Sequence, residues 1–150
     1  MSKYICIDSS VLVKVFIKED DSYKVKILLK KVLEDEQIIV LPAFAWAEIG
    51  TILRKKVRSG IITPREADEM WSGFRQLPGV EYLEDDLVAN LAWKISRNFN
   101  LPTLYDAAFL AVAETVTLRT GEECEFWTAD EKLVNSLNGK KGYVNLLNDM

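Results

Sequence analysis

Short apolar runs alternate along the chain with longer segments in which apolar residues recur every three or four positions. The short runs predict β-strands at residues 4–8, 37–41, 80–83, 124–128 and 143–147. The longer segments predict helices at about 9–18, 22–34, 44–60, 64–77, 86–98 and from 103 onward, with a short one after 130. Apolar strands separated by helices favour a mainly parallel sheet of four or five strands in a three-layer α/β/α sandwich.

Local signals indicate where three of the helices begin. Ser22 is suited to cap the helix over 22–34. Pro42 suits the first turn of the helix that follows the second strand. Thr63-Pro64-x-Glu66 has the pattern of a capping box, in which side chain and backbone bond reciprocally at a helix start.

Length and composition indicate one globular domain. The chain has 150 residues, of which 49% are hydrophobic and 28% charged, so residues 1–150 are expected to form a single domain with a substantial core. The longest apolar runs fall well short of the roughly 20 residues that cross a bilayer. The first residues lead directly into a strand with no signal-peptide pattern, which favours a cytoplasmic protein without membrane association.

The chain contains no histidine, and its two cysteines lie in separate strand-like runs. Cysteine–histidine zinc sites, serine or cysteine triads with histidine, and histidine general bases are therefore excluded. Cys6 and Cys124 are expected to be buried free thiols. Catalysis in this chain must rely on carboxylates, a metal ion, or lysine, tyrosine and serine side chains.

Four acidic residues stand in apolar or strand-ending surroundings: Asp8, Glu48, Asp106 and Asp130. Each has an ordinary explanation, as a helix cap for the three aspartates and as a surface residue for Glu48. A carboxylate in an apolar setting is costly unless something neutralises it, and hard divalent cations take carboxylate oxygens as ligands. Because ligands of parallel sheets gather at the carboxyl ends of the strands, we expect these four residues to converge there around one or two ions.

The segments around these acids resemble the PIN domain family, and the size of the chain resembles its VapC branch, the toxins of VapBC toxin–antitoxin pairs. The resemblance is carried by residues 4–10, 45–49, 104–114 and 127–133. The run Tyr-Asp-Ala-Ala-Phe-Leu-Ala around Asp106 and the order of the four acids are its most specific features. The segments extend from the first strand almost to the C-terminus, so the resemblance covers the whole domain.

The resemblance implies an endoribonuclease dependent on Mg²⁺ or Mn²⁺ that hydrolyses RNA phosphodiester bonds with metal-activated water. It implies that the four acids hold the metal and that Ser10 and Thr128 support the metal pocket. It also implies a homodimer and a small antitoxin protein whose tail covers the active-site groove.

The net charge of −4 requires any RNA-binding cations to be placed locally. One cluster near the end of the helix that carries Glu48 contains Arg54, Lys55, Lys56 and Arg58. These residues either compensate the dipole at the end of that helix or contact RNA.

Two other functions remain open from the residues alone. One is a phosphohydrolase with Asp8 as nucleophile, although Ser10 stands where such enzymes have a second aspartate. The other is a non-catalytic PIN-like module that binds protein through aromatic residues. The candidate aromatic residues for a partner surface are Phe44, Trp46, Trp71, Phe74 and Trp93.

Overall fold

Five parallel strands form the central sheet of the structure, a computed structural model that describes residues 2–150. The strands lie in the order β3-β2-β1-β4-β5. Their bounds are β1 Tyr4–Ile7, β2 Ile38–Pro42, β3 Val80–Leu83, β4 Glu125–Thr128 and β5 Val144–Leu146. β1 is central, and Ile5, Cys6 and Ile7 are all buried, as expected for a strand covered on both faces. The predicted α/β architecture is confirmed.

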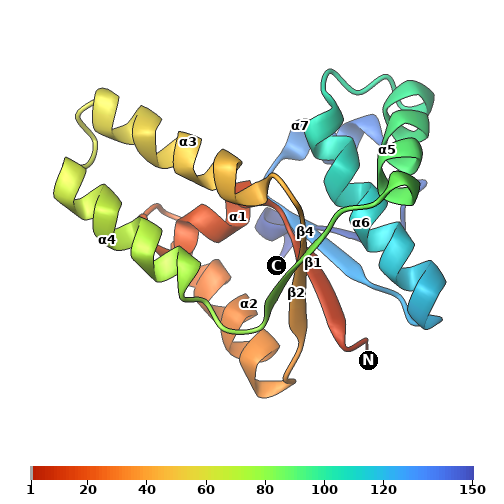
Figure 1. Ribbon diagram of the computed structural model, residues 1–150, viewed down its shortest axis with the longest axis horizontal. Coiled ribbons are helices and arrows are strands. Elements are labelled where there is room, and N and C mark those ends of the chain that lie inside the picture. The colour runs from red at the N-terminus through yellow and green to blue at the C-terminus, as the bar shows by residue number, and fades with distance from the viewer. Residues whose placement is uncertain (1) are drawn as a thin grey trace.

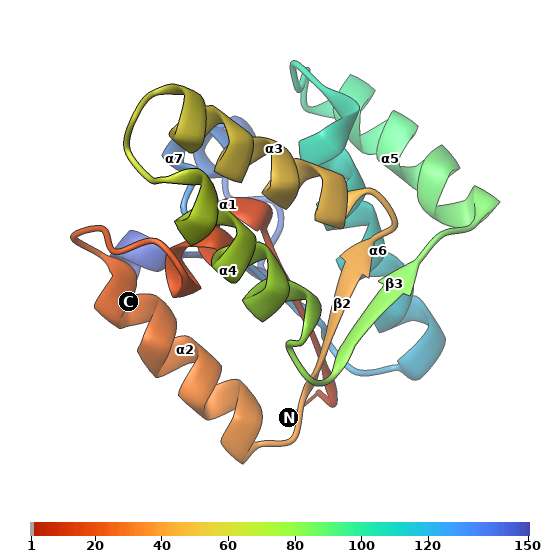
Figure 2. The same ribbon diagram turned by 60° about the vertical axis from the view of Figure 1, so that its left-hand side comes forward.

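Helices cover both faces of the sheet. Their bounds are α1 Ser9–Leu12, α2 Ser22–Glu34, α3 Ala45–Arg58, α4 Pro64–Arg75, α5 Asp86–Asn98, α6 Leu104–Thr120 and α7 Glu131–Ser136, with short 3₁₀ turns at Val13–Val15 and Leu147–Asp149. Figures 1 and 2 show α5 and α6 on one side of the sheet and α1 to α4 on the other. α6 contacts β1, β2 and β4 on one side and α5 on the other, which explains its continuous buried run from Ala107 to Ala113.

One helix start agrees with its local signal and two differ. Thr63 caps α4 and Glu66 completes the capping box, as predicted. The prediction for Pro42 was wrong, because this residue ends β2 opposite Leu83 of β3, and α3 begins only at Ala45. A proline is tolerated at the end of a strand, where no further ladder bond is required from it.

Ser22 does not cap α2. Its hydroxyl donates to the carbonyl of Ile17 at 3.0 Å and accepts the backbone N–H of Glu19 at 2.8 Å, while Asp21 occupies the capping position. The serine therefore closes the loop before the helix instead of satisfying the helix's own N–H groups. The segment after β1 also differs, because the predicted helix over 9–18 ends at Leu12 and continues as the 3₁₀ turn.

The two cysteines are free and buried, as predicted. Cys6 directs its thiol toward the carbonyl of Phe109 at 3.6 Å, which joins β1 to α6. Across residues 2–150, no helix combines the length and apolar character that a membrane crossing requires.

Candidate active site

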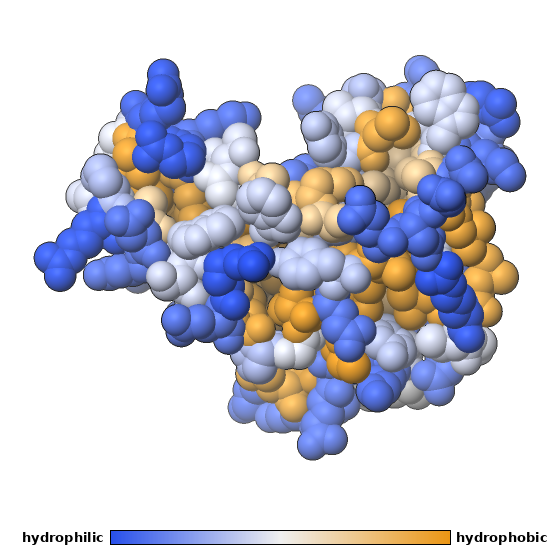
Figure 3. Space-filling model, in the orientation of Figure 1, coloured by the Kyte–Doolittle hydropathy of each residue, from blue (hydrophilic) through white to orange (hydrophobic). Residues whose placement is uncertain are grey.

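The four acidic residues come together at the carboxyl edge of the sheet. Asp8 directly follows β1, and Asp130 follows β4, the strand beside β1. Glu48 lies in the first turn of α3, which follows β2, and Asp106 lies in the first turn of α6. Figure 3 shows the surface hollowed between the part with α3 and α4 and the part with α5 and α6. Four segments far apart in sequence thus bring carboxylates to one edge.

Asp8 is held by two hydroxyls and does not use its side chain as a helix cap. It stands at the capping position of α1 but makes no side-chain capping bond, and it is only 7% exposed. Its Oδ2 accepts hydrogen bonds from Thr128 Oγ1 at 2.8 Å and from Ser10 Oγ at 3.2 Å. The hydroxyl of Thr128 also accepts the backbone N–H of Asp130 at 3.0 Å. Ser10 and Thr128 therefore position the first aspartate.

Glu48 has a partner that the sequence motifs did not indicate. The buried Ser9 donates its hydroxyl hydrogen to Glu48 Oε1 at 3.1 Å, across 39 positions of sequence. The only signal in the sequence is that Ser9, which directly follows Asp8, carries a hydroxyl in addition to that of Ser10, and nothing local shows that Ser9 reaches α3. The packing of α1 against α3 creates this contact.

The capping explanation holds for one of the two remaining aspartates. Asp130 Oδ1 accepts the backbone N–H of Leu133 at 3.2 Å, so Asp130 does cap α7. Thr103 makes no side-chain capping bond at the start of α6, so the capping box that Thr103 and Asp106 resemble in sequence does not form. Asp106 is therefore free of that structural role.

Burial and mutual repulsion raise the pKa of three of these carboxylates. Burial is the largest cause for Asp8, whose pKa is raised although its two hydroxyl partners oppose the shift. Burial raises the pKa of Glu48 to about 7, with further increases from the charges of Asp8 and Asp106. Burial likewise raises the pKa of Asp106 to about 6, with contributions from Asp8 and Asp130. The negative charges of neighbouring carboxylates therefore disfavour the ionised forms of Asp8, Glu48 and Asp106.

The site lacks an internal cation. Among residues 2–150, neither lysine nor arginine forms an ion pair with any of the four carboxylates. The donor set consists of oxygen atoms, which suits a hard divalent ion such as Mg²⁺ or Mn²⁺. Within the same residues no three Asp, Glu, Cys or His side chains stand close enough to hold one ion as they lie. The site fits such an ion in chemistry and charge, and a hydrated Mg²⁺ needs only one or two carboxylates as direct ligands.

The four residues of the basic cluster on α3 lie in different surroundings. Lys55 lines a cavity of about 370 Å³ that Glu48 also lines. Lys56 instead faces Glu19, at 3.8 Å. Arg54 lines a different, more apolar groove between α3 and α4, and Arg58 is exposed in the last turn. Only Lys55 shares a cavity with one of the four acids.

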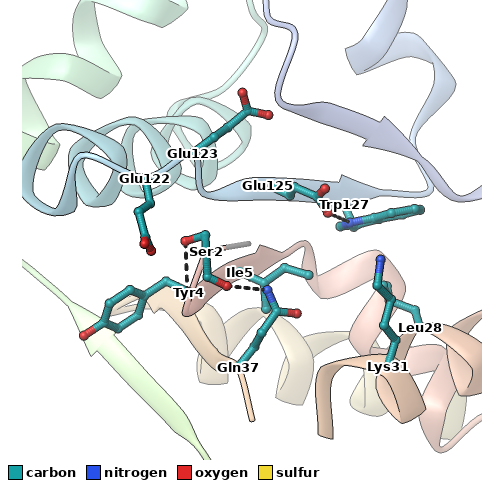
Figure 4. A pocket seen from close by; sticks show the side chains of 10 residues that line it. All are labelled: Ser2, Tyr4, Ile5, Leu28, Lys31, Gln37, Glu122, Glu123, Glu125 and Trp127. Atoms are coloured by element: carbon teal, nitrogen blue, oxygen red, sulfur yellow. Dashed lines mark hydrogen bonds between the residues drawn. The ribbon is translucent and has the colours of Figure 1, made fainter. Parts of the chain in front are cut away.

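A second cavity lies at the other end of the sheet. Figure 4 shows it at the start of β1 and β4, where Glu122, Glu123, Glu125 and Lys31 are among the lining residues. Its volume is about 380 Å³, and the indole N–H of Trp127 donates to Glu125 at 3.0 Å. None of the four site acids lines it, and its excess of glutamates disfavours nucleic acid.

The sequence model of the PIN domain matches residues 5–135, which contain all four acids. The chain belongs to the PIN domain family. PIN domains are generally nucleases that use divalent metal ions. The crystal structure of PAE2754 from Pyrobaculum aerophilum is similar to the chain with a TM-score of 0.54 at 18% identity, over 97% of this chain and 90% of that one. At that identity the likeness supports the PIN fold alone, and no curated protein matches the chain.

Proposed function

We propose that this PIN domain is an endoribonuclease that depends on Mg²⁺ or Mn²⁺ and hydrolyses RNA phosphodiester bonds. One observation carries the proposal: four carboxylates from separate segments meet at one edge of the sheet, burial and neighbouring negative charges raise the pKa of Asp8, Glu48 and Asp106, and none of the four has a cationic partner within residues 2–150. Membership of a family of metal-dependent nucleases supports it.

Asp8, Glu48, Asp106 and Asp130 would hold the ion. When bound there, a divalent ion would supply positive charge for the scissile phosphate and would lower the pKa of a water molecule that attacks it. Thr128 and Ser10 orient Asp8, and Ser9 orients Glu48. Asp130 is fixed through its bond to the start of α7. Hydroxyls and helix starts thus hold the carboxylates at this edge.

Cleavage of labelled single-stranded RNA tests the proposal. We expect cleavage with Mn²⁺ or Mg²⁺, none with EDTA, and recovery when the metal is returned in excess. Asp8→Asn and Asp106→Asn should abolish cleavage while the circular dichroism spectrum stays unchanged, because each removes a ligand charge and keeps the shape. Undiminished cleavage by either pure variant would refute the assigned site. Equal cleavage of DNA of the same sequence would refute the assignment to RNA.

We further propose that the protein is a toxin that is paired with a small antitoxin and assembles as a homodimer. The VapC-like motifs around the acids and the length of the chain support this proposal. Of the five candidate aromatic residues, Phe74 is buried, and Phe44 packs against the core. Trp46 is 48% exposed and lines the groove between α3 and α4 together with Trp71. Trp93 is exposed on α5.

Two measurements address these finer roles. Expression in growing cells should arrest growth with the wild-type chain and not with Asp106→Asn, because the arrest requires cleavage. Sedimentation at micromolar concentration should show a dimer. Normal growth during wild-type expression would contradict the toxin role, and a monomer would contradict the homodimer.

A further inference from the structure

The cavity that Lys55 and Glu48 share lies between α3 and the start of α6. Its volume is about 370 Å³, within the range of small-ligand sites. Its walls come from α3 and from Phe44 and Tyr105. Because Glu48 forms part of one wall and Asp106 directly follows Tyr105, the cavity opens beside the acidic site.

Tyr105 presents an aromatic ring at this cavity. It is 55% exposed although it adjoins a candidate metal ligand. Its ring packs on Phe44 with centroids 5.1 Å apart and an angle of 72°, and Phe44 packs in turn on the buried Phe109 at 6.1 Å and 88°. In an edge-to-face pair, at least one face of each ring lies outside the contact. The core therefore fixes the orientation of Tyr105 while a ring face stays open.

Lys55 supplies the opposite charge to the carboxylates. It lies seven residues after Glu48 on α3, and a spacing of seven returns to the same face of a helix about 10 Å further along. The wall of the cavity thus presents, in order, an acid of the candidate metal site, the small side chain of Thr51 and a cation. This order suits one nucleotide of an RNA strand, with one phosphate at the candidate metal site beside Glu48, the base in the cavity and the next phosphate at Lys55.

We propose that this cavity is a subsite for one unpaired RNA base, which stacks on Tyr105 while Lys55 contacts the neighbouring phosphate. The proposal rests on the proposed ribonuclease function and adds two residues that would position the RNA beside the acids, Tyr105 and Lys55. Base–aromatic stacking tolerates every base, because each has a π-face, so the subsite selects an unpaired nucleotide and not a sequence. A base inside a duplex is already stacked and cannot enter.

Binding of a short fluorescent single-stranded RNA tests the subsite, with Mg²⁺ present and in the Asp8→Asn background so that the RNA stays intact. Tyr105→Ala should weaken binding about 5- to 150-fold, the range found when a stacking side chain is removed. Tyr105→Phe should bind within about twofold of the parent, because the ring is kept. Trp93→Ala is the matched control, since Trp93 is 60% exposed on α5 and does not line the cavity.

Abasic substrates locate the contact. We expect a set of RNAs, each lacking one base, to contain one RNA that binds the parent protein more weakly than the intact RNA does. The same missing base should not weaken binding to Tyr105→Ala any further, because both changes remove the same stacking pair. Equal affinity of Tyr105→Ala and the parent would overturn the subsite, and so would an abasic set with no such position. If Tyr105→Ala weakens RNA binding as expected but the wild-type chain cuts no RNA with Mn²⁺, the proposed ribonuclease function is refuted and the RNA-binding subsite is not. If RNA is cut with no dependence on Tyr105, only the subsite fails.

Discussion

The metal-free protein should lose stability as the pH rises from about 4 to about 8, and Glu48→Gln should remove part of that loss. The pKa values of Asp8, Glu48 and Asp106 are raised in the folded state. Between the unfolded and folded pKa values, the folded protein holds protons that the unfolded chain has released. Stability falls with pH wherever the folded state binds more protons. The sign is opposite to that of an ion-paired carboxylate.

The size of the effect follows from two of these groups. The pKa of Glu48 goes from 4.5 to about 7, and that of Asp106 from 3.8 to about 6. One pKa unit corresponds to about 1.4 kcal/mol, so the full shifts amount to about 3 kcal/mol for each residue. Both side chains are only half-buried, and halving the values for solvent screening leaves about 1.5 kcal/mol each. We expect the free energy of unfolding to fall by about 3 kcal/mol over this range.

Urea denaturation with EDTA at pH 5, 6, 7 and 8 measures this loss, with the four tryptophans as fluorescent probes. Glu48→Gln should be more stable than the wild type at pH 8 by about 1.5 kcal/mol and nearly equal to it at pH 5, where Glu48 is largely protonated. Glu69→Gln is the matched control, because Glu69 is exposed on α4 and pairs only with exposed Arg65 at 3.7 Å. It should leave the pH dependence unchanged.

Adding Mg²⁺ or Mn²⁺ at 100 times its dissociation constant should raise the free energy of unfolding by about 2.7 kcal/mol at pH 8. The gain should shrink toward pH 5, where protons compete with the ion for the same oxygens. A flat or rising stability between pH 5 and 8 in EDTA would refute the repulsion. If Glu48→Gln lost as much unfolding free energy between pH 5 and pH 8 as the wild type, the loss would originate from groups other than Glu48.

Two further substitutions test the surroundings of the acids. Thr128→Val removes the hydroxyl that donates to Asp8 and accepts from the Asp130 backbone, so the free energy of unfolding measured in urea should fall by about 1–3 kcal/mol. RNA cleavage should be reduced in Thr128→Val and recover in Thr128→Ser. Unchanged stability of Thr128→Val would contradict the role of Thr128. Lys55→Glu should weaken RNA binding and make the salt dependence of binding shallower, whereas Lys56→Glu should change binding less, because Lys56 faces Glu19. Equal effects of the two variants in anisotropy titrations would contradict the assignment of Lys55 alone to the RNA path.

The sequence predicted the layers and the edge at which the acids meet, because both follow from periodicity. Buried parallel strands appear as continuous apolar runs, and residues that follow such strands share one edge of the sheet. The run before Asp8 shows both properties, whereas β4 before Asp130 begins at an exposed glutamate and shares only its place beside β1. Most helix bounds were recoverable for the same reason, and those of α2 and α5 coincide with the predicted ranges.

What the sequence did not reveal depends on how helices rotate and pack. Ser9 and Glu48 are 39 positions apart, and only the packing of α1 on α3 makes them partners. Lys55 and Lys56 are adjacent and chemically alike, yet the rotation of α3 turns one toward the acidic site and the other toward Glu19. Tyr105 belongs to the motif around Asp106, but its exposure depends on where α6 begins relative to Phe44. No local pattern encodes these relations.

All four acids lie at the start of a helix, which explains how the chain folds with them before any ion binds. Asp8 and Asp130 occupy the capping positions of α1 and α7, and Glu48 and Asp106 lie in the first turns of α3 and α6. The partial positive charge at a helix start stabilises a nearby carboxylate by about 0.3–1 kcal/mol. Four such contributions offset only part of the burial and repulsion that raise the pKa values of Asp8, Glu48 and Asp106. The helix starts therefore help to hold the carboxylates together, and the negative charge that remains is the charge that a divalent cation would neutralise in the proposed function.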